Sequence, residues 1–141
     1  MSRHCSESAH FKMVLMNTIP LVRIHGPGDI RIDQVERPRT GPNDVLVQVQ
    51  RCGICGSDLS YTKLGGIPGA AKPFALGHEF SGVVVETGQN VQHVAIGDRV
   101  IVNPDVRPLI SHHFPLSRFD EAFALAQQSD QALKVMVDCQ S

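Results

Sequence analysis

The stretch CGICGSD at residues 52–58, followed by GHEFSG at residues 77–82, is the most informative part of this sequence. Within it, Cys55, His78 and Glu79 offer a thiolate, an imidazole and a carboxylate. Zinc accepts such a mixture, and a catalytic zinc usually takes three protein ligands and keeps one position open. Each residue also has an ordinary alternative role, as a packed thiol or a solvated polar side chain. The donor types therefore predict a candidate metal site and leave the structural alternative open.

Short strands are expected on both sides of this stretch. Residues 44–51 show the clearest pattern, because Val45, Val47 and Val49 fall on one face and glutamines fall on the other. Glycine- and proline-rich turns separate the expected strands. Besides 44–51, these strands cover residues 13–16, 21–24, 30–35, 80–87, 99–102 and 133–137.

Two helices are expected among the strands. One covers about 57–63, with Gly56 or Ser57 near its N-cap. The other runs from the capping residue Ser117 to about Gln128, with apolar residues at helical spacing on one side. The sequence thus predicts a mainly β fold with peripheral helices, arranged as a β-barrel-like domain.

Composition argues against several functions. The net charge is −1, which gives no electrostatic case for binding nucleic acid or an acidic membrane. No apolar run approaches the roughly 20 residues of a membrane span. The four cysteines lack the dense pairing of small secreted domains, so we expect reduced thiols, a cytoplasmic location and no export.

The Cys52–Cys55 pair has other interpretations. It has the C-x-x-C spacing of redox motifs, but those open a helix in a βαβ setting and this region is mostly β. A zinc ribbon would need a second such pair, which the sequence lacks. For Cys52 we favour a small buried apolar role, and for Cys139 a packed thiol.

Several of these motifs resemble those of zinc-containing alcohol dehydrogenases. The signature of that family is matched by Gly77, His78, Glu79, Gly82, Gly88 and Val91. Residues 53–58 resemble the first zinc-ligand motif, and residues 97–100 resemble a recurring barrel turn. The stretch from Ile24 to Val102 is similar to the co-chaperonin-like (GroES-like) barrel of medium-chain dehydrogenases, closest to those acting on sorbitol, threonine and butanediol.

The resemblance implies roles for individual residues. Cys55 and His78 would bind zinc, and Glu79 would be a ligand or a nearby carboxylate that exchanges with water. Ser57 would pass the proton of the substrate hydroxyl toward solvent. Zinc would act as a Lewis acid on a secondary alcohol or polyol, and NAD or NADP would accept the hydride in the full-length enzyme.

The sequence departs from the family in several places. Ser60 stands where many members carry a histidine of the proton relay, and we expect it to be a solvated helix residue. The four-cysteine lobe of a structural zinc and the usual remaining ligand of the catalytic zinc are both missing. His112 and His113 precede the second helix, where we expect surface positions rather than ligands.

The family's cofactor domain also has no counterpart here, because the chain contains no G-x-G-x-x-G fingerprint. We expect a disordered leader over 1–12 and a GroES-like catalytic domain over 13–141. That domain would comprise a barrel part over 13–103 and a C-terminal return segment over 106–141, with the cofactor domain deleted around 103–107.

Three hypotheses remain open from the sequence. The first is the catalytic domain of a zinc-dependent NAD(P) alcohol or polyol dehydrogenase, inactive as an isolated chain. The second is a non-catalytic GroES-like module that assembles with itself or a partner. The third and weakest is a redox protein using Cys52 and Cys55. Under the first hypothesis, an apolar face exposed near the zinc cleft would favour homo-oligomers.

Overall fold

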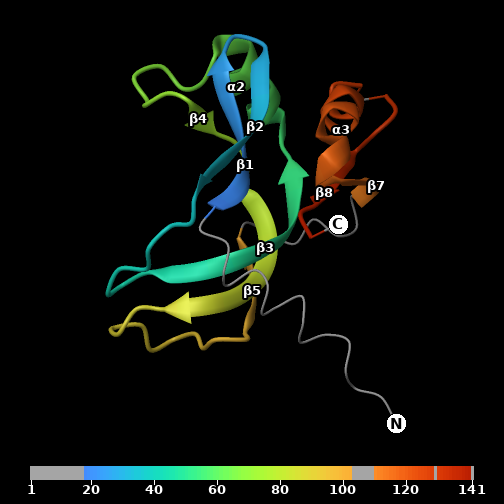
Figure 1. The fold of residues 1–141 in the computed structure, drawn as a ribbon. Coiled ribbons are helices and arrows are strands. Elements are labelled where there is room, and N and C mark those ends of the chain that lie inside the picture. Colours follow the sequence, from blue (N-terminus) through green and yellow to red (C-terminus); the bar gives the residue numbers. More distant parts are fainter. Residues whose placement is uncertain (1–17, 103–109, 129, 141) are drawn as a thin grey trace.

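The computed structural model describes residues 18–102, 110–128 and 130–140. Within these residues the chain is mainly β-sheet with a few short helices, as the sequence predicts (Figure 1). The expected leader over 1–12, the expected strand over 13–16 and the expected junction around 103–107 lie outside the described residues. In the described part, no helix is both long enough and apolar enough to cross a membrane.

The smaller of the two sheets has three strands in the order β2-β1-β4. Strand β1 (Thr18–Gly26) and strand β2 (Asp29–Glu36) form an antiparallel hairpin. Its turn contains Gly28, whose φ of 73° is a left-handed conformation that glycine adopts without strain. Strand β4 (Phe74–Ala75) pairs with the other edge of β1. The strands expected over 21–24 and 30–35 are therefore confirmed.

The larger sheet has five strands in the order β6-β5-β3-β8-β7. Four of these strands were expected, and the structure gives their bounds as β3 (Val45–Ile54), β5 (Glu79–Thr87), β6 (Arg99–Val102) and β8 (Lys134–Asp138). All neighbouring pairs in this sheet are antiparallel except β7 and β8, which are parallel. Strand β8 lies beside β3, so residues more than 80 positions apart in sequence become neighbours.

The structure corrects three expectations about the C-terminal part and the first helix. Strand β7 (Ile110–Pro115) occupies the segment that we expected only to lead into a helix, so His112 and His113 lie on an edge strand. The second helix, α3 (Phe119–Ala126), begins after a 3-10 turn (Leu116–Arg118) that contains Ser117, and Arg118 is its N-cap. Helix α2 (Gly56–Leu64) is capped by Cys55 instead of Gly56 or Ser57.

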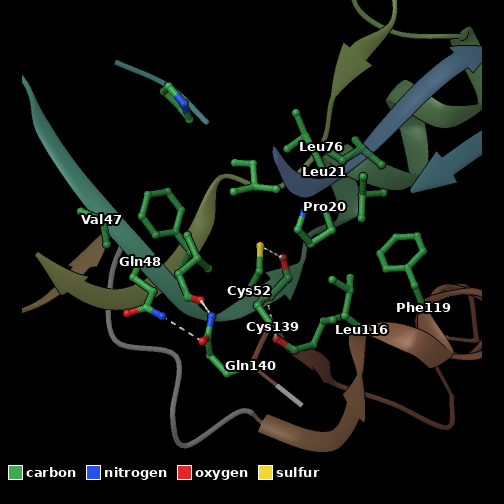
Figure 2. A pocket seen from close by; sticks show the side chains of 18 of the residues that line it. Pro20, Leu21, Val47, Gln48, Cys52, Leu76, Leu116, Phe119, Cys139 and Gln140 are labelled. Atoms are coloured by element: carbon green, nitrogen blue, oxygen red, sulfur yellow. Dashed lines mark hydrogen bonds between the residues drawn. The ribbon is translucent and has the colours of Figure 1, made fainter. Parts of the chain in front are cut away.

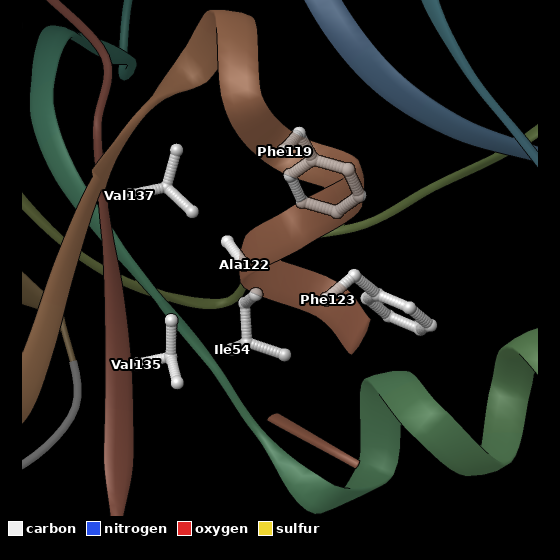
Figure 3. Packing of buried hydrophobic residues seen from close by; sticks show 6 residues of the cluster. All are labelled: Ile54, Phe119, Ala122, Phe123, Val135 and Val137. Carbon is white, nitrogen blue, oxygen red and sulfur yellow. The ribbon is translucent and has the colours of Figure 1, made fainter. Parts of the chain in front are cut away.

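A cluster of buried apolar side chains joins helix α3 to the large sheet (Figure 3). Helix α3 contributes Phe119, Ala122 and Phe123, the i, i+3, i+4 stripe expected from the sequence. The sheet contributes Ile54, Val135 and Val137. Fully burying each large apolar side chain stabilises the fold by about 1.5–3 kcal/mol. This packing fixes the end of β3, which leads directly into Cys55.

Candidate metal site

Cys55 lies between the end of β3 and the start of α2. Its backbone N–H donates to the Asp58 carboxylate at 2.9 Å, and its carbonyl accepts from the Asp58 N–H at 3.0 Å. These two hydrogen bonds close the first turn of the helix and satisfy groups that a helix N-terminus leaves unpaired. The backbone that carries the Cys55 thiol is therefore held at both its N–H and its carbonyl.

Glu79 is the first residue of the neighbouring strand β5, and His78 immediately precedes it. They follow Gly77, whose φ of 98° is unfavourable for any residue with a side chain. A Cβ at Gly77 would also lie 2.9 Å from the Cys52 sulfur, too close for an ordinary contact. Glu79 is paired across the sheet with Gly53, near the end of β3. Strand pairing thus places Glu79 at the same end of the sheet as Cys55.

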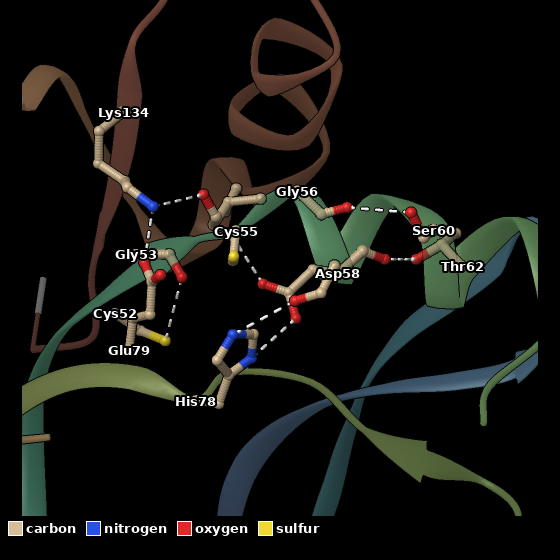
Figure 4. A network of polar contacts seen from close by, with 12 residues as sticks. Cys52, Gly53, Cys55, Gly56, Asp58, Ser60, Thr62, His78, Glu79 and Lys134 are labelled. Carbon is tan, nitrogen blue, oxygen red and sulfur yellow. Dashed lines mark hydrogen bonds and ion pairs between the residues drawn. The ribbon is translucent and has the colours of Figure 1, made fainter. Parts of the chain in front are cut away.

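The structure brings the three predicted ligands together (Figure 4). One ligand atom from each of Cys55, His78 and Glu79 lies within 4.8 Å of the other two, and in the described part of the chain this is the one such group of potential ligands. Cys55 and Glu79 are partly buried, whereas the His78 side chain is 43% exposed. Sulfur, nitrogen and oxygen donors at this spacing fit a zinc ion, with room on the His78 side for a further ligand.

Two polar groups flank the His78 ring. Asp58 Oδ1 lies 3.4 Å from His78 Nδ1 and is buried without a conventional hydrogen bond. Ser57 Oγ lies 3.3 Å from His78 Nε2, the other ring nitrogen. Histidines that bind metals usually present their second nitrogen to a carboxylate or carbonyl, which fixes the ring orientation. This arrangement favours Nε2 as the nitrogen available to a metal, with Ser57 beside it.

Glu79 has a cationic partner that sequence analysis missed. Lys134 Nζ lies 2.7 Å from Glu79 Oε2, and both side chains are largely buried. Burial alone would raise the pKa of Glu79. The hydrogen bond and charge of Lys134, together with the Cys55 hydrogen bond and the His78 charge, outweigh burial, so this pKa lies below its usual value. No local signal marks Lys134, because only the pairing of β3 with β8 brings it to the site.

Other candidates lie away from the three ligands. Ser60 is exposed and donates to the Gly56 carbonyl at 3.3 Å, which confirms the solvated helix position expected for it. His113 is also exposed, as expected, and lies 3.7 Å from Asp138. His112 is half-buried and contacts the Ser111 hydroxyl.

Cys52 faces a different environment from Cys55. It lines an apolar cavity of about 520 Å³ to which residues of β1 and β3 contribute. Leu21, Leu76, Phe119 and Cys139 also line this cavity (Figure 2). Burial raises the pKa of the Cys52 thiol to about 12, and burial also raises the pKa of Cys139. Cys52, Cys55 and Cys139 are free thiols. Thiol–disulfide chemistry needs an accessible thiolate, so the geometry disfavours the redox hypothesis.

Comparison with known proteins identifies the family. Residues 41–115, more than half of the chain, match the model of the alcohol dehydrogenase GroES-like domain. The chain belongs to this family. The match confirms both the resemblance seen in the motifs and the GroES-like fold.

Relatives and solved structures agree with this assignment. The chain is 41% identical to sorbitol dehydrogenase of Mus musculus over 99 residues, which cover 69% of this chain and 28% of that protein. It also resembles the crystal structure of 2R,3R-butanediol dehydrogenase from Bacillus subtilis, with 43% identity, a TM-score of 0.54, and coverage of 60% of this chain and 27% of that one. A cobalt- and zinc-bound alcohol dehydrogenase from Pyrobaculum aerophilum gives 31% identity and a TM-score of 0.54, over 60% of this chain and 26% of that one. The chain therefore spans just over a quarter of the length of these relatives.

Proposed function

We propose that this chain forms the zinc-binding catalytic domain of an NAD- or NADP-dependent dehydrogenase that acts on a secondary alcohol or polyol. The observation that carries the proposal is the convergence of Cys55, His78 and Glu79 within 4.8 Å. A scaffold has no need for three such donors at one point. Relatives named as sorbitol and butanediol dehydrogenases support a small hydroxylated substrate.

In this proposal each residue has a defined role. Cys55 would provide the sulfur ligand from a helix N-cap, and His78 would provide Nε2 while Asp58 orients its ring. When bound, zinc would lower the pKa of an alcohol so that an alkoxide forms near neutral pH. Ser57 would take the substrate proton and pass its own toward solvent, a role supported by the 3.3 Å contact of its Oγ with His78 Nε2. Ser60 takes no part, because its hydroxyl is engaged with the helix backbone.

The hydride acceptor would bind elsewhere in the complete enzyme. The sequence has no dinucleotide-binding fingerprint, and it covers just over a quarter of its relatives. We therefore expect no turnover of NAD or NADP by this chain alone, and no specific binding of NAD in calorimetry. A submicromolar affinity for NAD would contradict this part of the proposal. The free thiols also suit a reducing compartment, so we propose the cytoplasm as the site of action.

One observation favours the alternative of a self-assembling GroES-like module. Strand β6 is an edge of the large sheet, and Ile101 and Val102 on it are 56% and 44% exposed. Val102 is paired with Phe80, next to Glu79, so this apolar edge lies at the site end of the sheet. Exposed apolar edge strands promote association with other chains. Light scattering that shows only a monomer at high concentration would argue against this alternative.

Metal analysis separates the two functions. The chain would be purified without added zinc, and its zinc content compared with that of Cys55→Ser, using Cys52→Ala as the matched control. The catalytic proposal predicts similar zinc content in the wild type and in Cys52→Ala, and strongly reduced zinc in Cys55→Ser. Equal zinc content in the wild type and Cys55→Ser would favour the scaffold.

A further inference from the structure

Sheet pairing builds a contact between the C-terminal strand and the candidate metal site. Gly53 on β3 is paired with Glu79 on one side and with Met136 on the other. Lys134 precedes Met136 by two residues in β8, so it projects from the same face of the sheet. From that position its side chain can reach Glu79 only by passing over Gly53.

Gly53 provides the space for this crossing. A Cβ at this position would lie 3.0 Å from Glu79 Oε2, 3.3 Å from Met136 Sδ and 3.5 Å from Lys134 Cδ. Any larger residue would therefore push apart the groups that meet above it. The backbone also contributes, since the Ile54 carbonyl lies 3.5 Å from Lys134 Nζ.

The resulting ion pair is sheltered from solvent. The side chains of Lys134 and Glu79 are 13% and 14% exposed, and Nζ lies 2.7 Å from Oε2 (Figure 4). A charge-assisted hydrogen bond of this length is stronger than a neutral one, and partial burial reduces screening by solvent. One oxygen of Glu79 is thus engaged by a cation before any metal binds.

We infer that Lys134 is a positioning residue that competes with a bound metal for the Glu79 carboxylate. This inference rests on the proposed metal site and deepens it. The ammonium engages Oε2 of Glu79 at 2.7 Å and withdraws negative charge from this carboxylate. Because the lysine charge offsets part of the negative charge that a divalent ion would use, the carboxylate binds metal weakly and exchanges readily, which leaves a coordination position for substrate or water. Lys134 lies outside residues 41–115, so the family match does not extend to it.

The test uses Co²⁺ as the probe, bound by the full chain and followed by absorption. We expect Lys134→Met, which keeps an unbranched side chain of nearly the same length but removes its charge, to bind Co²⁺ about tenfold more tightly than the wild type. The intensity of the cobalt d–d bands should change because Glu79 then stays coordinated. Lys134→Arg keeps the cation and should bind within about twofold of the wild type. Unchanged or weaker binding by Lys134→Met would overturn the inference.

A double-mutant cycle checks that the effect passes through Glu79. In a Glu79→Gln background, adding Lys134→Met should change the Co²⁺ affinity by less than about twofold. A persistent tenfold gain would show that the lysine charge acts on the metal directly, which contradicts the inference.

The thiolate-to-cobalt charge-transfer band distinguishes failure of the proposed metal site from failure of the inference about Lys134. If the wild type lacks this band, the proposed function fails together with the inference. If the band is present but Lys134→Met has no effect, only the inference fails.

Discussion

Cys52 and Cys55 stand three positions apart at the end of one strand, yet their thiols belong to regions of opposite character. Cys52 lines an apolar cavity, and burial raises its pKa to about 12. Cys55 caps a helix and lies beside the imidazole of His78 and the carboxylate of Glu79. The different roles of the two cysteines therefore depend on where β3 ends. Cys52 is still in the strand and its thiol faces the cavity, whereas Cys55 is at the helix start and its thiol faces the other candidate ligands.

The largest expected effect concerns the reactivity of Cys52. A pKa of about 12 leaves roughly one Cys52 thiol in ten thousand ionised at pH 8, and the thiolate is the nucleophile. We expect iodoacetamide to label Cys52 about a thousandfold more slowly in the folded protein than in urea, as measured by peptide mass spectrometry. Zinc should protect Cys55 and leave the Cys52 rate unchanged. Labelling of folded Cys52 within tenfold of the unfolded rate would remove the contrast between the two regions.

Substitutions in the two regions should differ in their effect on zinc affinity by about a hundredfold. His78→Gln removes a proposed ligand, and we expect the zinc dissociation constant to rise by about two orders of magnitude or more in a competition titration. Cys52→Ala changes only the cavity and should stay within about threefold of the wild type. Comparable losses in both variants would indicate that zinc binds between the two cysteines instead.

The ionisation of Cys52 in the cavity should make the free energy of unfolding depend on pH. The folded-state pKa of Cys52 is raised from 9.0 to about 12, so above pH 9 the unfolded chain loses a proton that the folded chain keeps. The stability linked to this thiol is present below pH 9 and is lost as the pH rises toward 12, at up to about 1.4 kcal/mol per pH unit. Urea unfolding at several pH values should show a shallower decline for Cys52→Ala. Parallel declines would mean that Cys52 ionises equally in both states.

The smallest effect tests whether the cavity is unfilled space. Val85 lines it, so Val85→Ile adds a methylene where there is room and should stabilise the protein by about 0.5 kcal/mol in urea unfolding. Val84, the preceding residue of β5, is fully buried and does not line the cavity, so Val84→Ile should lower stability. A loss of stability in both variants would show that the cavity closes in solution.

Most of the fold followed from local patterns. The alternation of residues 44–51 and the apolar spacing of residues 119–126 correctly predicted β3 and α3, because each pattern matches the period of its element. Strand β7 was missed because its polar sequence gains strand structure from parallel pairing with β8 at a sheet edge. Cys55 was missed as a helix cap because cysteine is not among the usual capping residues.

The candidate site was only partly predictable. The donor types of Cys55, His78 and Glu79 indicated a metal, and the family resemblance implied which metal. Their meeting within 4.8 Å depends on the pairing of β3 with β5, which no short motif encodes. The position of Lys134 and the cavity around Cys52 both depend on the pairing of β3 with β8, whose residues are more than 80 positions apart, so sequence patterns gave no indication of either.

X-ray absorption at the zinc K-edge tests the central claim most directly. For the zinc-loaded chain we predict one sulfur ligand at about 2.3 Å, with the remaining nitrogen and oxygen ligands at about 2.0–2.2 Å. Cys55→Ser should lose the sulfur contribution, whereas Cys52→Ala should keep it. Two sulfur ligands in the wild type would place a second cysteine on the metal, and none would exclude Cys55, so either result would contradict the site described above.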